Sequence, residues 1–160
     1  MSKQPLQERP YRKCVGILLL NQDNHVFVAQ RIDQRVEAWQ MPQGGVDAGE
    51  DPKSAAYREL EEEIGTANAE LLAESGDWHA YDLPADLADK VWKGRYRGQT
   101  QKWFALRFLG DDGEINIETE HPEFSEWRWV PIDNLVELAV SFKQDIYRQV
   151  VDEFRKALQI

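Results

Sequence analysis

Residues 44–66 read GGVDAGEDPKSAAYRELEEEIGT, and this stretch decides how the rest of the chain is interpreted. Asp51 is a residue type that caps helix N-termini, Pro52 fits the first helical position, and Gly65 commonly ends helices. The stretch therefore predicts a helix from about residue 52 to residue 64. Three apolar residues recur along it at four-residue steps and form a side that can pack against a sheet. They are Ala56, Leu60 and Ile64.

Glu59, Glu62 and Glu63 occupy a neighbouring side of the same predicted helix. They stand three and four positions apart, so their carboxylates converge and repel one another. They also lie near the helix C-terminus, where the helix dipole disfavours negative charge. A divalent cation bound between them would remove both costs, and clustered carboxylate oxygens suit Mg²⁺ or Mn²⁺. Taken alone, the three carboxylates fit a solvated helix face better than a metal site.

The spacing of the whole stretch changes that balance, because it resembles the Nudix box. This box is the signature of hydrolases that cleave nucleoside diphosphates linked to another group. The resemblance implies an α/β fold, the Nudix fold, in which a mixed β-sheet is sandwiched between α-helices. Thr66 departs from the family pattern, which has an aliphatic residue there, and this change affects packing but no ligand. The matching positions are Gly44, Glu50, Arg58, Glu59, Leu60, Glu62, Glu63 and Gly65.

The resemblance also implies a metal site. The Gly44 carbonyl, Glu59 and Glu63 are its expected ligands, and Glu62 is either a further ligand or the base that activates water. Glu123 corresponds to the family's distal carboxylate on the metal side and joins the catalytic set. The implied cofactor is Mg²⁺, with Mn²⁺ as a substitute, and such an ion neutralises phosphate charge and generates hydroxide near neutral pH. The identity of the general base and the number of metal ions stay open.

Other positions of the box have structural roles by the same resemblance. Arg58 and Glu50 are expected to form an ion pair that fixes the loop against the helix. Gly45, together with Gly44, lets the backbone approach a metal or a phosphate that a Cβ would obstruct. Gly65 ends the helix. The alternative for Arg58 and Glu50 is ordinary exposed charge.

Strands and helices are mixed along the rest of the chain, which predicts an α/β sandwich. The apolar run 15–20 is typical of a strand buried on both faces, and a polar turn joins it to a second strand at 26–30 as a hairpin. No linker or internal repeat interrupts the sequence, so we expect a single Nudix hydrolase domain over residues 1–160. Further strands are predicted at 69–78, 101–109, 114–117 and 126–130, and helices at 132–139 and 142–158.

Segments outside the box carry more of the family pattern, including WQMPQGG at 39–45, GQTQKWF at 98–104 and WRWV at 127–130. Together they resemble the branch that contains bacterial RNA pyrophosphohydrolases and dinucleoside polyphosphate hydrolases. The likeness runs from Tyr11 to about Phe154. It implies that substrate phosphates are contacted by three cationic residues and that an aromatic residue stacks on a base. The cations are Arg12, Arg31 and Lys143, and the aromatic residue is Phe142.

Residues 90–104 independently favour a polyanionic substrate, because they contain five basic residues, four aromatic residues and no acidic one. Cations interleaved with rings suit phosphate chains and bases. We expect Lys102 to contact phosphate and regard Arg95 and Arg97 as further candidates. The alternative is a solubilised β-hairpin whose aromatic residues lie in the core.

Composition limits the remaining classes of function. Nineteen basic and 29 acidic residues give the 160-residue chain a net charge of −10, so a DNA-binding or nucleic-acid-coating protein is not expected. Cys14 is the one cysteine, which excludes a disulfide framework and favours a reducing compartment, the cytoplasm. The run 15–20 is too short to span a membrane, and the polar start lacks the apolar segment of a secretory signal. A monomer is the working expectation, although the sequence leaves the oligomeric state open.

The predicted activity is hydrolysis of phosphoanhydride bonds by a Mg²⁺-dependent Nudix hydrolase. Its substrates would be 5′-triphosphorylated RNA ends, which lose pyrophosphate, or dinucleoside polyphosphates, or both. Diadenosine tetraphosphate would give ATP and AMP. The alternative is a catalytically inactive Nudix-fold module that binds nucleotides or RNA. The three intact box glutamates argue against it, because binding alone would not require all three.

Overall fold

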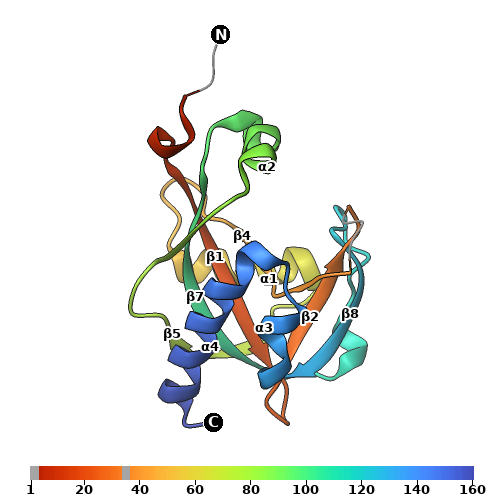
Figure 1. Ribbon diagram of the computed structural model, residues 1–160. Coiled ribbons are helices and arrows are strands. Elements are labelled where there is room, and N and C mark those ends of the chain that lie inside the picture. Colours follow the sequence, from red (N-terminus) through yellow and green to blue (C-terminus); the bar gives the residue numbers. More distant parts are fainter. Residues whose placement is uncertain (1–3, 34–36) are drawn as a thin grey trace.

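The computed structural model describes residues 4–33 and 37–160, and among them eight strands form one mixed sheet (Figure 1). The strands are β1 (Tyr11–Leu20), β2 (His25–Arg31), β3 (Trp39–Gln40), β4 (Gln43–Gly45), β5 (Ala69–Glu74), β6 (His79–Asp82), β7 (Gly98–Phe108) and β8 (Phe124–Pro131). The α-helices are α1 (Pro52–Ile64), α2 (Ala85–Lys90), α3 (Leu135–Leu138) and α4 (Gln144–Leu158). Short 3₁₀ turns are η1 (Leu6–Glu8), η2 (Val91–Gly94), η3 (Asp112–Glu114), η4 (Ile132–Asn134) and η5 (Ser141–Lys143).

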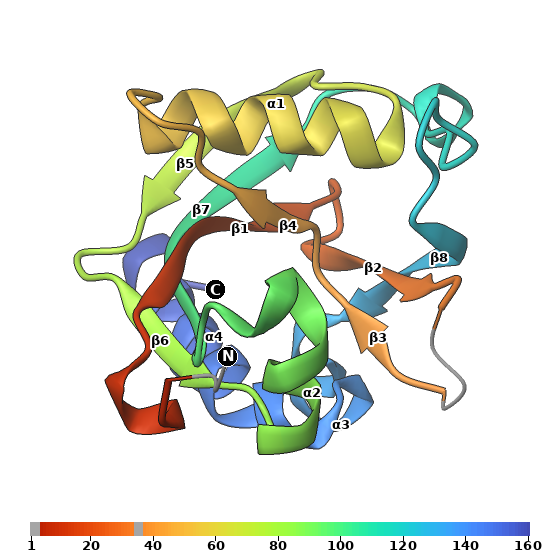
Figure 2. The same cartoon turned by 90° about the horizontal axis from the view of Figure 1, so that it is seen from above.

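Strand β1 is the centre of the sheet. It runs parallel to β7 over its whole length, from Tyr11 opposite Gly98 to Leu20 opposite Arg107. Its side chains alternate between two hydrophobic layers, as a strand buried on both faces requires. Leu18 belongs to the layer beneath α3 and α4, whereas Ile17 belongs to the layer beneath α1. The predicted sandwich of a mixed sheet between helices is therefore confirmed, and Figure 2 shows α1 on one side of the sheet and α4 on the other.

Helix α1 begins and ends where the sequence predicts. The Asp51 carboxylate accepts a hydrogen bond from the Ser54 amide at 3.3 Å, and Pro52 occupies the first turn. Gly65 ends the helix in the left-handed region at φ +81°, which favours glycine. The predicted apolar side is fully buried against the sheet and holds the polar side of the helix in a fixed orientation. It comprises Ala56, Leu60 and Ile64.

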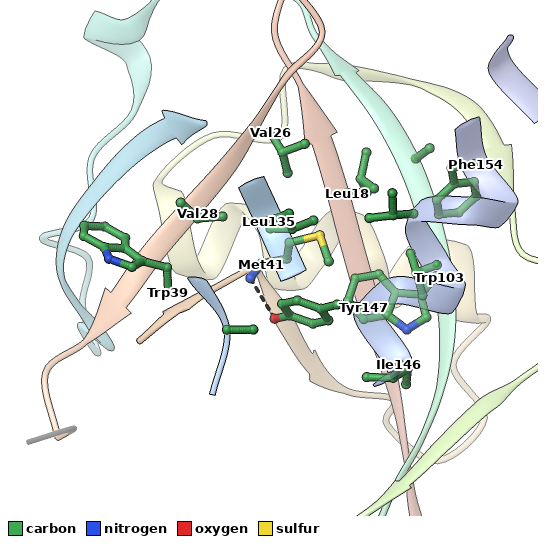
Figure 3. Close-up of a cluster of buried hydrophobic side chains, with 14 of the residues drawn as sticks. Leu18, Val26, Val28, Trp39, Met41, Trp103, Leu135, Ile146, Tyr147 and Phe154 are labelled. Atoms are coloured by element: carbon green, nitrogen blue, oxygen red, sulfur yellow. Dashed lines mark hydrogen bonds between the residues drawn. The ribbon is translucent and has the colours of Figure 1, made fainter. Parts of the chain in front are cut away.

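The opposite layer contains the larger aromatic side chains (Figure 3). Trp103 of β7 and Tyr147 of α4 are fully buried and meet edge to face, with ring centroids 5.9 Å apart. The Tyr147 hydroxyl accepts a hydrogen bond from the Met41 amide at 3.0 Å. Met41 lies between β3 and β4, so this one bond connects the core of α4 to the segment that leads into the box.

Several elements differ from the prediction. The expected strand at 114–117 is wrong, because Asp111 and Glu114 form a reciprocal capping box that turns the chain through η3. The strand predicted at 69–78 ends at Glu74. The sequence did not predict β4, β6 or α2, which are short and lack a clear hydrophobic period. Strand β4 pairs with β1 in antiparallel orientation, with Gly45 opposite Cys14.

Three further features of the chain are its lack of a membrane span within the described residues, its single cysteine and its number of domains. Within the described residues, no helix is long and apolar enough to cross a membrane. Cys14 is a free thiol that is completely buried in β1. The single domain over residues 1–160 stays a prediction.

Replacing Tyr147 by phenylalanine tests the connection between α4 and the segment before the box. The Tyr147→Phe variant leaves the buried Met41 amide without an acceptor, which should lower the free energy of unfolding by ~1–3 kcal/mol. Chemical denaturation measures this loss, and hydrogen exchange should accelerate at the Met41 amide but not at Ala55 in α1. Unchanged stability together with unchanged protection of Met41 would show that the hydroxyl contributes nothing.

Candidate active site

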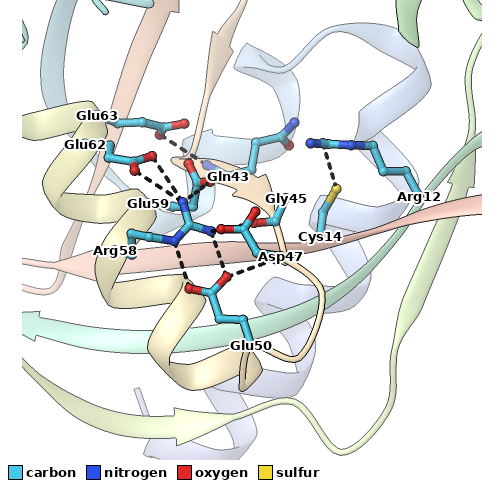
Figure 4. Close-up of polar contacts among 10 residues, drawn as sticks. All are labelled: Arg12, Cys14, Gln43, Gly45, Asp47, Glu50, Arg58, Glu59, Glu62 and Glu63. Atoms are coloured by element: carbon cyan, nitrogen blue, oxygen red, sulfur yellow. Dashed lines mark hydrogen bonds and ion pairs between the residues drawn. The ribbon is translucent and has the colours of Figure 1, made fainter. Parts of the chain in front are cut away.

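Arg58 holds the loop before α1 against the helix (Figure 4). Its Nε and Nη2 atoms each donate to one carboxylate oxygen of Glu50 at 2.8 Å, a bidentate geometry. The same Nη2 donates to the Gly45 carbonyl at 2.9 Å, and the pKa of Glu50 is lowered chiefly by its hydrogen bonds from Arg58. Arg58 and Glu50 therefore form the predicted ion pair, which ties the loop to both the helix and β4.

The two glycines at the start of the box leave room for charged side chains. A Cβ added to Gly44 would lie 2.0 Å from the carboxylate carbon of Glu59, and one added to Gly45 would lie 2.3 Å from Nη2 of Arg12. Neither distance is tolerable, so any larger residue would displace one of these two side chains. The two glycines therefore allow charged side chains to approach the backbone closely. Gly44 leaves room for the Glu59 carboxylate, and Gly45 leaves room for the Arg12 guanidinium.

The three box glutamates differ in their partners and in their exposure. Arg58 Nη1 lies between Glu59, at 2.9 Å, and Glu62, at 3.2 Å. Glu63 accepts a hydrogen bond from the Gln43 amide at 3.3 Å and is only 4% exposed. Glu62 is exposed. The cation of Arg58 therefore relieves the repulsion of Glu59 and Glu62, while Glu63 lies in a separate, buried position.

Burial leaves two of these carboxylates poorly compensated. Desolvation raises the pKa of Glu59 to about 7, although hydrogen bonds from Arg58 oppose the rise. Desolvation also raises the pKa of Glu63 well above its usual range, and the nearby charges of Glu123 and Glu59 raise it further. At Glu59 the ion pair with Arg58 does not offset the cost of burial, and within the described residues Glu63 forms no ion pair.

The donor set fits a hard divalent cation. One oxygen of Glu63 is buried without a hydrogen-bond partner, and the absence of a Cβ at Gly44 leaves space beside Glu59. The candidate donors are carboxylate and carbonyl oxygens, which Mg²⁺ and Mn²⁺ prefer. In the part of the chain that the structure describes, no three acidic, histidine or cysteine side chains already surround a common point. Glu59, Glu63 and the Gly44 carbonyl are the groups that would hold such an ion.

A cavity of about 520 Å³ opens beside these glutamates. Glu59, Glu62 and Glu123 line it, so the structure brings the distal carboxylate to the box as expected. Three cations of different elements line the same cavity, which therefore presents acidic groups for a metal and basic groups for an anion. The cations are Arg12, Arg31 and Lys143.

Lys143 lies at the buried end of the cavity. Its Nζ atom donates to the amide oxygens of Gln40 and Gln43, each at 3.4 Å. Burial and the charge of Arg31 lower the pKa of Lys143 to about 8, so it is still mostly protonated at pH 7. The amide Nε2 of Gln40 is buried without a partner, although Gln40 lines the cavity. These neutral donors and one cation are arranged to receive an anionic oxygen.

The other predicted substrate contacts also lie at the cavity. Arg31 pairs with Asp33 through two hydrogen bonds of 2.8 and 2.9 Å, so an anionic ligand would have to share this guanidinium. Phe142 is half-buried and stacks on Tyr81 with ring centroids 6.0 Å apart. It is neither a fully buried core residue nor a free platform, and both rings line the cavity.

Lys102 is not among the described residues that line the cavity. Val15 and Phe104 lie in the layer beneath α1, and Lys102 stands opposite Val15 and two positions before Phe104. It therefore projects from the α1 face of β7, whereas the cavity residue Gln99 projects from the other face. Arg97 is also occupied elsewhere, because it pairs with Asp82 at 2.9 Å.

Six cavity residues with polar or aromatic side chains were absent from the predicted site. Gln40, Gln43 and Gln99 lie in the segments 39–45 and 98–104, which match the family pattern. No feature of the sequence singled out these three positions as site residues. Strand alternation would have placed Gln99 and Gln101 on the face opposite Lys102, which is the signal that could have found them. The missed residues are Asp33, Gln40, Gln43, Tyr81, Trp92 and Gln99.

Comparison with known proteins identifies the class. The NUDIX domain family matches residues 10–150. Because this match covers most of the chain, the protein belongs to the Nudix family, and the predicted class of Nudix hydrolase is confirmed. Members of this family generally use a divalent metal, in agreement with the oxygen donors at α1.

Individual relatives agree with this assignment. The chain is 58% identical to the RNA pyrophosphohydrolase of Roseobacter denitrificans, over 99% of this chain and 100% of that protein. It is 60% identical to the RNA pyrophosphohydrolase of Rhodospirillum rubrum, over 90% of this chain and 87% of that protein. Among solved structures, a C. elegans Ap4A hydrolase complex has a TM-score of 0.64 at 18% identity, covering 91% of this chain and 98% of that one. The last likeness concerns the fold alone.

Removing Arg58 should damage stability and activity together. The Arg58→Ala variant leaves Glu50 and the Gly45 carbonyl without their donor, so the melting temperature should fall by a few degrees and the loop before α1 should lose protection from hydrogen exchange. Arg58→Lys is the matched control, because its point charge cannot form the bidentate contact and should recover only part of the loss. Loss of activity with unchanged melting temperature and loop protection would refute the structural role.

The raised pKa of Glu59 predicts how pH and metal act on stability. Its folded-state pKa of about 7 lies above the ordinary value of 4.5, so its contribution to stability is present below pH 4.5 and is lost as pH rises through 7. In EDTA, the melting temperature of the wild type should therefore fall between pH 5 and pH 7 by more than that of Glu59→Gln. Mg²⁺ should stabilise the wild type more at pH 7 than at pH 5.

Thermal melts of both proteins, with EDTA and with Mg²⁺, measure these differences. The interval ends at pH 7 because the lowered pKa of Lys143 has the opposite effect above it. Identical pH dependence in the wild type and in Glu59→Gln would contradict the assignment.

Proposed function

We propose that this protein removes pyrophosphate from the 5′ end of triphosphorylated RNA. The observation that carries the proposal is that carboxylates and cationic side chains line the same cavity, with Glu59 among the former and Lys143 among the latter. Two relatives that match nearly the whole chain at 58% and 60% identity are named RNA pyrophosphohydrolases, which supports the same substrate. Dinucleoside polyphosphates are a second candidate, because they contain the same chain of linked phosphates.

In the proposed reaction, the residues of the chain bind and orient the phosphates. Arg12, Arg31 and Lys143 hold the anionic chain, and Lys143 is prevented from moving by the amide oxygens of Gln40 and Gln43. An in-line water attacks one phosphorus, its proton passes to a carboxylate of the cavity, and the phosphoanhydride bond breaks. On RNA the products are a 5′-monophosphate end and pyrophosphate, or successive phosphates.

The metal proposed for this site is Mg²⁺, with Mn²⁺ as a substitute. Glu59, Glu63 and the Gly44 carbonyl would hold it, with Glu62 and Glu123 at the cavity side. When bound, such an ion neutralises phosphate charge and makes hydroxide available near neutral pH. The raised pKa values of Glu59 and Glu63 support this role, since a bound cation would offset the cost of burying their charges.

Phe142 and Tyr81 are proposed to hold a base. They stack on each other at the cavity wall, and a base could extend this stack with a contribution of ~1–3 kcal/mol. The cytoplasm is the proposed compartment, since the single cysteine favours a reducing environment and triphosphorylated RNA ends arise there.

Glu63→Gln tests the catalytic proposal. The variant keeps the shape of the buried side chain but removes the charge, so kcat on triphosphorylated RNA should fall by several orders of magnitude. Glu61→Gln is the matched control, because Glu61 lies two positions earlier on the same helix and is exposed. The measurement is pyrophosphate release from RNA with Mg²⁺ and with EDTA, beside ATP release from diadenosine tetraphosphate.

The outcomes separate the rival functions. Metal-dependent release by the wild type and the control, but not by Glu63→Gln, supports the proposed hydrolase. Tight RNA binding without any release in the wild type would favour an inactive binding module. A kcat/KM much higher on diadenosine tetraphosphate than on RNA would instead make the dinucleoside polyphosphate the principal substrate.

A further inference from the structure

A second, shallower hollow of about 280 Å³ adjoins the active-site cavity. Arg12 and Trp92 line both the cavity and the hollow, so one extended ligand could contact both. The other described residues of this hollow are Lys93, Arg95 and Tyr96. We call it the outer hollow.

The outer hollow concentrates positive charge that the protein itself does not use. Within residues 4–33 and 37–160, its three cations Arg12, Lys93 and Arg95 form no ion pair with a carboxylate. Arg97, two positions away, differs in being paired with Asp82. In a chain with a net charge of −10, three adjacent unpaired cations are available for an external anion.

Two aromatic rings complete the outer hollow. The Arg12 guanidinium lies over the Trp92 ring at 5.0 Å, and Tyr96 meets the same ring edge to face with centroids 5.9 Å apart. Neither ring belongs to the fully buried core. Rings beside cations are the combination that binds the bases and phosphates of single-stranded nucleic acids.

The backbone of this segment adopts an unfavourable conformation to present these groups. Trp92, Lys93 and Gly94 all have positive φ angles, of 48°, 59° and 69°. A bulky residue in the left-handed region is a genuine outlier, and such strain clusters at functional sites. Figure 1 shows α2 and the following segment beyond the end of the sheet where β1 begins, and Arg12 comes from that end of β1.

We propose that the outer hollow binds the second and following nucleotides of a single-stranded RNA whose 5′-triphosphate occupies the main cavity. The phosphodiesters would meet Lys93 and Arg95, and a base would contact Tyr96 or Trp92. This inference rests on the proposed function and deepens it. All phosphates of a dinucleoside polyphosphate lie between its two nucleosides, so cations beyond a nucleoside would have nothing to bind. Only a polynucleotide places phosphates on that outer side.

The test compares substrates of increasing length. They are a nucleoside triphosphate, 5′-triphosphorylated oligoribonucleotides of increasing length from a dimer, and diadenosine tetraphosphate, each measured with Mg²⁺. For the wild type, KM should fall at least tenfold from the mononucleotide to the longer oligonucleotides. In the double variant Lys93→Ala/Arg95→Ala, this decrease of KM with RNA length (the gain from length) should disappear. KM for the nucleoside triphosphate and for diadenosine tetraphosphate, which have no following nucleotide, should change less than twofold.

A matched control separates local contacts from net charge. The double variant Lys53→Ala/Lys156→Ala removes the same charge from exposed positions on α1 and α4 and should keep the gain from length. The slope of log KM against log salt on the longest RNA should fall by about 1.4 in Lys93→Ala/Arg95→Ala, or ~0.7 for each lost phosphate contact. Tyr96→Leu should raise KM for the longer RNAs roughly five- to hundredfold if a base stacks there.

The results that would contradict this inference differ from those that would contradict the proposed function. If the wild type releases pyrophosphate from RNA but KM is independent of length, or if both double variants behave alike, the outer hollow does not bind RNA. If Lys93→Ala/Arg95→Ala weakens diadenosine tetraphosphate as much as RNA, the hollow holds a second nucleoside and the inference is wrong. If the wild type releases nothing from any RNA, the proposed function itself fails.

Discussion

The bidentate contact between Arg58 and Glu50 is the interaction on which the site depends. Arg58 reaches four groups at once: Glu50 and the Gly45 carbonyl fix the loop, and Glu59 and Glu62 receive its remaining donor. One guanidinium thereby aligns β4 with α1 and keeps two repelling carboxylates at the cavity. A lysine could supply the charge but not this geometry, because its ammonium is a single point donor. The buried apolar side of α1 fixes the orientation of the helix. The positions of the acidic groups on α1 therefore follow from the contact of Arg58 with Glu50 and from helix packing.

The acidic residues of α1 are therefore held in place by Arg58 and by helix packing. Glu59 is held by Arg58, Glu63 is buried with one unpaired oxygen, and both have raised pKa values. Such a site stores an unfavourable charge distribution that a divalent cation would relieve. On the far side of the cavity, Lys143 is fixed by two glutamine side chains, which connect through Met41 and Tyr147 to the core around α4. Acidic and basic walls are thus supported by separate hydrophobic layers on the two faces of one sheet.

Much of this could be predicted from the sequence, because local signals and tertiary packing agree. The caps and apolar period of α1 fixed its bounds, and the spacing of the box identified the family and the pair of Arg58 with Glu50. The orientation of Glu63 could not be predicted, because it depends on how far α1 is buried and on the Gln43 amide. Lys102 was misplaced because its charge was weighed without the alternation of β7, which directs it to the α1 face. The strained turn at Trp92 has no local sequence signal, since bulky residues seldom adopt positive φ angles.

Glu59 and Glu63 are proposed to form an acidic site that a divalent cation completes. Calorimetric titration of the metal-free protein with Mg²⁺ near pH 6.5, in two buffers of different ionisation enthalpy, measures both affinity and the protons released. Because both carboxylates bind protons unusually tightly, we expect metal binding to release protons, about one of them from Glu59 at this pH. Glu59→Gln should remove that share of the release and weaken binding. Tight binding of Mg²⁺ with no proton release, or equal affinity for Mg²⁺ in Glu59→Gln, would contradict a metal site at Glu59 and Glu63.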